Sequence, residues 1–166
     1  MTRPTSRPRQ RLSGFSMVEL ITVLVIIGIM GVAVMPRFGQ VTAFYETGYR
    51  DKVKATLEYA RKSAVAQRRY SCVSRVGNDL LVTIDQGVPE AYAGGCPATV
   101  LALPADDSDC NPVEANRICP RAGVTLAGSA AIVFSPLGAP SAAGVYTVTG
   151  GAVQTITVEA ETGYVH

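Results

Sequence analysis

The chain has 166 residues, 48% of them hydrophobic, and its mean hydropathy is +0.22. One apolar segment near the N-terminus raises both values. The roughly 130 residues that follow it suffice for one small globular domain, which excludes a large multidomain protein. The net charge of +2 is unevenly spread, because residues 76–166 carry two basic side chains against nine acidic ones. This acidity repels phosphate and argues against nucleic-acid binding by that part of the chain.

A basic arm precedes an apolar run at the N-terminus. The arm contains four arginines: Arg3, Arg7, Arg9 and Arg11. The 21 residues 15–35 contain a single charge, on Glu19. A helix of this length spans about 31 Å, enough to cross a bilayer core of about 30 Å. The arm predicts that the N-terminus stays in the cytoplasm while the rest of the chain is translocated.

Glu19 and the junction before Phe15 both need a chemical explanation. A carboxylate inside a membrane helix costs about 2.5–3.5 kcal/mol on insertion scales, so Glu19 is a functional candidate. Cleavage after Gly14 would give Phe15 a free α-amino group. That ammonium would pair with Glu19, four residues on, in the same helix or in a neighbouring chain.

The chain resembles the type IV prepilin and pseudopilin family in the stretch Gly14-Phe15-Ser16-Met17-Val18-Glu19-Leu20, which an unbroken apolar helix follows to about Pro36. The resemblance implies a leader peptide, residues 1–14, that prepilin peptidase removes between Gly14 and Phe15. The same enzyme would N-methylate Phe15. Glu19 would guide the subunit into a helical filament by meeting the N-terminus of its neighbour.

The resemblance also implies the partners and the location. Other pilins or pseudopilins would pack against the N-terminal helix, residues 15–36, on an assembly platform of the bacterial inner membrane. The chain would cross that membrane once and place its C-terminal domain in the periplasm. The expected function is that of a minor pilin or pseudopilin, a structural subunit of a type IV pilus or a type II secretion pseudopilus.

Two simpler interpretations explain less. An ordinary secretory signal peptide has an apolar core of about 7–15 residues and an A-x-A site, whereas this run is longer, carries Glu19 and lacks a clear site. A plain single-pass anchor accounts for the length of the run but leaves the Gly14–Phe15 junction unexplained.

The helix is expected to continue past Pro36, with a kink there, to about Arg68. Its second half, residues 37–69, has apolar side chains at spacings of 4, 3 and 4: Val53, Leu57, Ala60 and Ala64. That spacing is the apolar stripe of an amphipathic helix, which predicts packing against a sheet.

Residues 70–166 show the pattern of a strand-rich domain. Strands are predicted at 71–76, 80–85, 100–103, 130–134, 144–149 and 153–159, with a short terminal strand at 164–166. Gly77-Asn78-Asp79 is a hairpin signal, whereas 86–99 and 104–123 are rich in loop residues. One long helix followed by strands predicts an α+β fold, with the helix on one face of an antiparallel sheet.

The family resemblance implies the same architecture. In more detail, the C-terminal domain resembles the minor pseudopilin H or FimT-like branch in Phe134-Ser135-Pro136-Leu137-Gly138 and in the closing Glu161-Thr162-Gly163-Tyr164-Val165-His166.

All four cysteines, Cys72, Cys96, Cys110 and Cys119, lie in the part that is expected to be translocated. An even count in an oxidising compartment predicts two disulfides, and no C-x-x-C pair indicates zinc. Three connectivities are open to four cysteines. The sequence favours Cys72–Cys96 with Cys110–Cys119, because the second pair closes a short loop that contains Pro112.

The residues predict no enzyme, cofactor or metal site. His166, the single histidine, is the last residue, which gives no basis for a catalytic triad, and no phosphate-binding glycine loop is present. Asp106-Asp107-Ser108-Asp109 could offer oxygens to Ca²⁺, but it lacks the spacing of an EF-hand loop. A solvated acidic loop is the preferred interpretation.

A DNA-binding minor pilin that acts in DNA uptake is the alternative function. In the FimT-like branch this activity goes with a C-terminal Gly-Arg-x-Arg pattern, and the corresponding residues 163–166 lack both arginines. A basic cluster remains on the amphipathic helix: Arg61, Lys62, Arg68 and Arg69. We interpret it as a solvated helix face, which makes nucleic acid an improbable partner.

Overall fold

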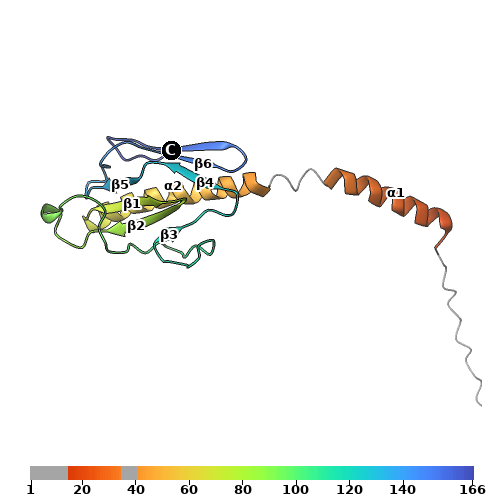
Figure 1. Ribbon diagram of the computed structural model, residues 1–166, viewed down its shortest axis with the longest axis horizontal. Helices are drawn as coiled ribbons and strands as arrows, with labels where there is room; N and C mark the ends of the chain where they lie inside the picture. The colour runs from red at the N-terminus through yellow and green to blue at the C-terminus, as the bar shows by residue number, and fades with distance from the viewer. Residues whose placement is uncertain (1–14, 35–40) are drawn as a thin grey trace, which may run out of the picture. The chain divides into compact units, whose positions relative to one another are not determined.

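The computed structural model describes residues 15–34 and 41–166, and these form two units that are considered separately. The first unit contains helix α1, Met17–Val34; the second contains helix α2, Val41–Gln67, and the strands (Figure 1). The expected leader, residues 1–14, and the expected kink at Pro36 lie outside the described residues.

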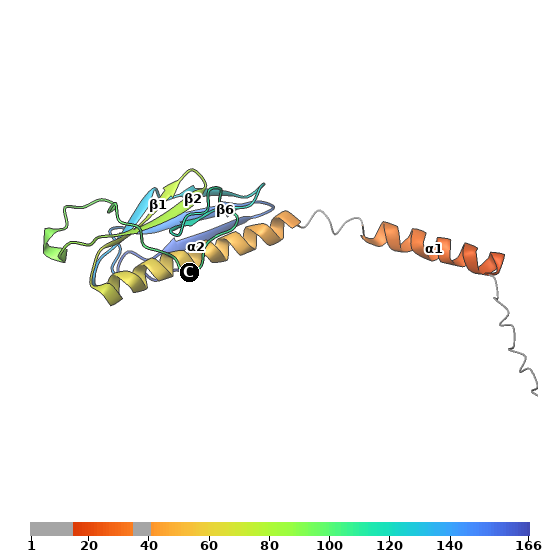
Figure 2. The ribbon, with the colours of Figure 1, turned by 90° about the horizontal axis from the view of Figure 1, so that it is seen from below.

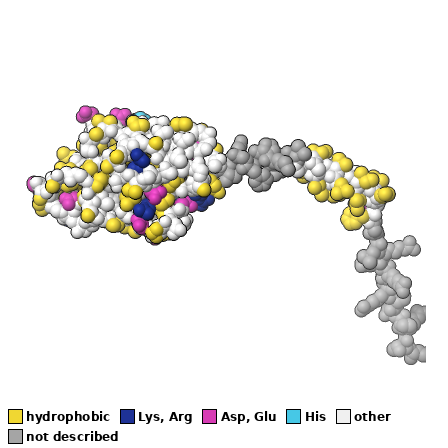
Figure 3. Space-filling view, in the orientation of Figure 1, with side chains coloured by type: hydrophobic (Ala, Val, Ile, Leu, Met, Phe, Trp, Pro, Cys, Tyr) yellow, Lys and Arg dark blue, Asp and Glu magenta, His cyan; other side chains and the backbone are white. Residues whose placement is uncertain are grey.

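Helix α1 begins with half of a capping box. Ser16 is its N-cap, and the Ser16 Oγ accepts a hydrogen bond from the backbone N–H of Glu19 at 3.2 Å. Serine followed three residues later by glutamate is the spacing of this motif. The helix that follows is apolar on all sides, and its described side chains are exposed (Figure 3).

Helix α2 supplies the central element of the second unit. The predicted stripe of Val53, Leu57, Ala60 and Ala64 is fully buried, which confirms the amphipathic helix. The helix ends at Gln67, one residue before the predicted end, and Arg68 then adopts a φ of 52°.

Within residues 41–166, seven strands form two antiparallel sheets instead of the one sheet expected. They are β1 Ser71–Val76, β2 Asp79–Ile84, β3 Arg117–Ile118, β4 Thr125–Gly128, β5 Ala131–Phe134, β6 Gly144–Thr149 and β7 Val153–Val158. The first sheet has the order β3-β2-β1-β5 and the second β4-β6-β7. A short 3₁₀ helix, η2, covers Pro89–Ala91 in the loop after β2.

Both sheets pack on α2 (Figure 2). Val82 and Phe134 from the first sheet and Tyr146 and Ile156 from the second are almost completely buried against the helix stripe. The Ser71 Oγ also donates a hydrogen bond of 2.8 Å to the carbonyl of Ala60. The α+β prediction is therefore correct, and α2 packs against both sheets.

Several predicted strands differ from those in the structure. β1 and β6 have the predicted bounds, β2 begins and ends one residue earlier, and β5 and β7 are each shorter by one residue. β3 and β4 were not predicted, because β3 has only two residues and β4 consists partly of alanine and glycine. The predicted strands at 100–103 and 164–166 are reduced to isolated bridges, Val100 to Thr83 and Val165 to Val158.

Candidate functional site

The exposed apolar surface of α1 is the first candidate site. Phe15 is 81% exposed and Ile29 is 67% exposed, and neither has a partner among the described residues. Glu19 lies in the first turn of the helix, and its side chain is also exposed. Gly14, the other residue of the expected cleavage site, lies outside the described residues.

Within residues 15–34 and 41–166, no helix combines the length and the apolar character that a membrane crossing requires.

A buried glutamate joins α2 to the second sheet. Glu46 is completely buried, and its Oε2 accepts hydrogen bonds from the backbone N–H groups of Ala152 at 2.8 Å and Gly151 at 2.5 Å. These two donors, Ala152 first, hold the pKa of the Glu46 carboxyl below its usual value, against the opposing effect of burial. The start of α2 is therefore fixed to the turn between β6 and β7.

A second polar contact joins α2 to the loop before β3. The Lys52 Nζ lies 2.7 Å from Asp107 Oδ1 and 2.6 Å from Asp109 Oδ2. The other oxygen of Asp107 accepts the backbone N–H of Cys119 at 3.0 Å. Burial disfavours the charged form of Lys52, but the two carboxylates outweigh it and raise the pKa of the ammonium. We call Lys52, Asp107 and Asp109 the lysine clamp.

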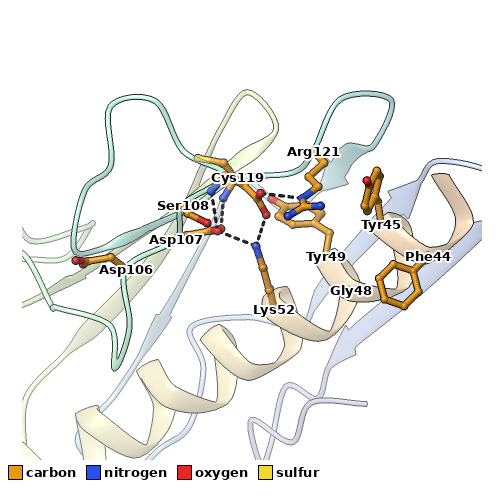
Figure 4. A pocket seen from close by; sticks show the side chains of 11 residues that line it. Phe44, Tyr45, Gly48, Tyr49, Lys52, Asp106, Asp107, Ser108, Cys119 and Arg121 are labelled. Carbon is orange, nitrogen blue, oxygen red and sulfur yellow. Dashed lines mark hydrogen bonds and ion pairs between the residues drawn. The ribbon is translucent and has the colours of Figure 1, made fainter. Parts of the chain in front are cut away.

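A cavity of about 380 Å³ lies beside the lysine clamp, between α2 and the loop (Figure 4). On one side the guanidinium of Arg121 stacks over the ring of Tyr45, 4.7 Å from its centroid, and the Arg121 Nε binds Asp109 Oδ1 at 2.8 Å. The hydrogen bond from Lys52, followed by that from Arg121, lowers the pKa of Asp109. Lysine and arginine therefore neutralise two of the three acids that line this cavity, Asp107 and Asp109.

The interpretation of Asp106-Asp107-Ser108-Asp109 as a solvated acidic loop is wrong for two of its three acids. Asp106 is exposed, but Asp107 is buried and the side chain of Asp109 is only 17% exposed. The Lys52 ammonium lies between these two carboxylates. Within the described ranges, no group of three or more His, Cys, Asp or Glu residues is placed to hold a metal ion.

The cysteines form two disulfides, Cys72–Cys96 and Cys110–Cys119, which are the pairs that the sequence favoured. The first ties the loop after β2 to the buried strand β1. The second closes residues 110–119 directly after the two acids of the lysine clamp: Asp109 precedes Cys110, and the N–H of Cys119 binds Asp107.

The basic cluster on α2 is only partly a solvated face. The Arg61 Nε donates a hydrogen bond of 3.2 Å to the carbonyl of Gly138, and Arg69 reaches the carbonyl of Asp85 at 3.4 Å. Gly163 packs on the same site, because a Cβ on it would lie 2.5 Å from the Gly138 carbonyl oxygen. The two C-terminal stretches that carried the narrower family resemblance therefore meet at Arg61.

Sequence reasoning missed both polar contacts of α2. Glu46 lies one turn before Tyr49 on the continuation of the apolar stripe. Its burial could therefore be predicted from the helical spacing. Lys52 and Asp107 are 55 residues apart, and no local pattern relates them.

Comparison with known proteins gives a likeness at the level of the fold. No protein-family model matches the chain, and no curated protein sequence matches it. Among solved structures, the type IV minor pilin FimU of Pseudomonas aeruginosa superposes with a TM-score of 0.50 at 16% identity, covering 75% of this chain and 86% of FimU. The fold is that of a type IV minor pilin. A second crystal form of FimU matches 70% of this chain and 86% of its own, with a TM-score of 0.48 and 16% identity.

Proposed function

We propose that the chain is a minor pilin or pseudopilin, a non-catalytic subunit of a type IV pilus or a type II secretion pseudopilus. One coincidence carries the proposal: a chain with the N-terminal pattern Gly14-Phe15-Ser16-Met17-Val18-Glu19 also has the fold of a minor pilin. The pattern supplies a processing site and an acid in an apolar helix. The fold supplies the domain that such a helix carries.

In this proposal the chain has four functional parts. Residues 1–14 are the leader, 15–36 cross the inner membrane and later line the filament, and 37–69 and 70–166 form the periplasmic domain. Prepilin peptidase cuts between Gly14 and Phe15 and methylates the new amino group. The described part of this arrangement offers a partner an apolar helix with all its described side chains exposed.

Assembly proceeds through α1 on the inner-membrane platform. The Glu19 carboxylate pairs with the N-terminal ammonium of a neighbouring pilin or pseudopilin, which offsets the cost of placing the acid among apolar helices. The exposed ring of Phe15 and the apolar side chains after Glu19 bury their surface against the same neighbour.

The DNA-binding alternative has less support. Arg61 is already bound to Gly138, and the Lys62 ammonium lies 3.3 Å from Glu58, so the basic cluster is partly used within the domain. Nothing in the described residues replaces the two arginines that residues 163–166 lack. We therefore prefer the function of a structural subunit to that of a DNA-binding pilin. The sequence resemblance alone supports placing it in the minor pseudopilin H or FimT-like branch.

Processing tests the proposal directly. The full chain is expressed with and without a prepilin peptidase, and the N-terminus of the membrane-associated product is read by mass spectrometry. We expect a product that begins at methylated Phe15 only when the peptidase is present. Gly14→Val should stay uncleaved, and Gly28→Val serves as the matched control that is cleaved normally. A chain that keeps Met1 under all conditions would refute the proposed processing.

A further inference from the structure

Three segments meet at the end of the second unit where α2 begins. We call residues 42–45, 121–123 and 150–153 the base. A Cβ placed on Gly123 would lie 3.2 Å from Thr42, and one placed on Gly151 would lie 3.6 Å from Ala43. Arg121 stacks on Tyr45. Residues from α2, from the loop before β4 and from the β6–β7 turn thus share one surface.

The base differs in composition from the rest of the second unit. It contains no Asp or Glu, whereas the chain carries twelve such acids after Glu19, and its single charged side chain is Arg121. Glu46, which lies next to the base, is completely buried, and Asp109 is paired with Arg121. The surface is therefore depleted of the negative charge that dominates residues 76–166.

The base also exposes two large apolar side chains. Phe44 is 76% exposed and Val153 is 68% exposed, while the residues around them are mainly alanine, glycine and threonine. Figure 4 shows Phe44 on α2 at the edge of the cavity that Lys52 and Arg121 also line. An exposed phenylalanine beside small uncharged residues and one arginine is suited to the boundary between lipid headgroups and acyl chains.

The covalent connection between α1 and α2 is short. Only six residues, 35–40, separate Val34 from Val41, and a chain of that length spans at most about 25 Å when fully extended. If α1 is anchored in a bilayer, the first turn of α2 lies within that distance of the membrane. Helix α2 itself runs for 27 residues, about 40 Å, away from its first turn.

We propose that the base is a lipid-contacting surface of the subunit before assembly. Phe44 and Val153 enter the headgroup region, and Arg121 lies at lipid phosphates while it keeps its contact with Asp109. This inference rests on the proposed membrane anchoring of α1. It adds that the folded domain lies against the bilayer through a defined face, so that incorporation into a filament requires the base to leave the lipid.

The absence of tryptophan from the sequence permits a direct test. Single-tryptophan variants of the full chain are reconstituted in vesicles of phosphatidylethanolamine and phosphatidylglycerol, with or without brominated acyl chains. F44W and V153W report on the base. L24W reports on α1, and L137W, which is 91% exposed in the turn beside Arg61, is the matched control at the other end of α2.

We expect the brominated lipid to reduce the fluorescence of L24W, F44W and V153W, each about twofold or more, and to leave L137W unchanged, because interfacial side chains lie near the acyl-chain boundary. Quenching of L24W without quenching of F44W and V153W would overturn the inference and leave the anchoring intact. A blue-shifted tryptophan emission of F44W that brominated lipid does not quench would indicate a contact with protein, and it would also overturn the inference. An unquenched L24W would refute the anchoring itself.

Discussion

The Oε2 of Glu46 accepts a hydrogen bond of 2.5 Å from the backbone N–H of Gly151, across 105 residues of sequence. The acceptor lies in the second turn of α2 and the donor in the turn between β6 and β7. A charged acceptor makes this contact stronger than a neutral one. The contact therefore links the ionisation of one carboxyl to the attachment of the second sheet.

Replacing Glu46 by glutamine should weaken the domain and flatten its response to acid. The backbone donors Ala152 and Gly151 hold the pKa of the native carboxyl below its usual value. The folded state therefore binds fewer protons than the unfolded state and loses stability as the pH falls through that lowered pKa. We expect Glu46→Gln to lower the urea midpoint at pH 7 and to reduce its change between about pH 5 and pH 3. A wild-type acid response retained in full by the variant would contradict this role.

Replacing Lys52 by methionine should destabilise the domain by about 2 kcal/mol. Breaking a buried ion pair costs about 3–5 kcal/mol, but the Lys52 side chain is 38% exposed, and solvent screening lowers the expected loss. Methionine keeps the aliphatic stem and removes the ammonium, which leaves Asp107 unpaired. Urea unfolding of the full chain in detergent, followed by far-ultraviolet circular dichroism, gives the change.

Two further variants separate the lysine clamp from a general charge effect. Asp106→Asn removes a neighbouring exposed acid and should change the free energy of unfolding by less than about 0.5 kcal/mol. The double variant of Lys52→Met with Asp107→Asn should recover part of the loss, because no unpaired buried charge remains at Asp107. If Asp106→Asn proves as costly as Lys52→Met, the clamp does not account for the stability.

Removing the charge of Glu19 should impair incorporation into filaments while membrane insertion continues. Both variants keep the backbone bond to Ser16. Glu19→Val loses the charge and a side chain that suits the capping box, whereas Glu19→Gln keeps such a side chain and loses only the charge. We expect the incorporation of both variants into filaments to fall about tenfold or more, because losing an ion pair worth about 1.4 kcal/mol changes an equilibrium tenfold. Immunoblots of sheared filaments and of inner-membrane fractions measure the two quantities. Normal incorporation of Glu19→Gln would assign Glu19 to helix capping instead of assembly.

The domain should bind DNA weakly and without dependence on its basic cluster. Arg61 is occupied by Gly138, and the acids of residues 76–166 repel phosphate. We expect gel shifts of the full chain in detergent at low salt to show no tight complex. Tight, salt-sensitive binding that is lost when Arg68 and Arg69 are both replaced by alanine would favour the DNA-uptake alternative.

The sequence predicted the elements whose formation depends on residues close together in the chain. The stripe from Val53 to Ala64 gave the buried face of α2, and the Gly77 turn gave the β1–β2 hairpin, where Gly77 adopts a φ of 62°. Ser16 and Glu19 have the spacing of a capping box, so the start of α1 also follows from a local rule.

The features that the sequence did not reveal depend on contacts between distant residues. The division into two sheets is set by which strands pair, such as β4 with β6, and strand composition alone does not determine this. The burial of Asp107 depends on Lys52, and an isolated acidic run is expected to be solvated until such a partner is known. The base likewise appears only when three separate segments are brought together.

The two polar contacts of α2 also bear on how the domain carries mechanical load. In a filament under tension, force would enter the second unit through the first residues of α2. Glu46 and Lys52 lie in the first half of that helix and fix it to different parts of the domain, the β6–β7 turn and the loop before β3. A force along α2 would therefore load both contacts together, before it loads the apolar stripe that begins at Val53. The attachment points nearest the pulling end are charged hydrogen bonds, which can re-form after slipping.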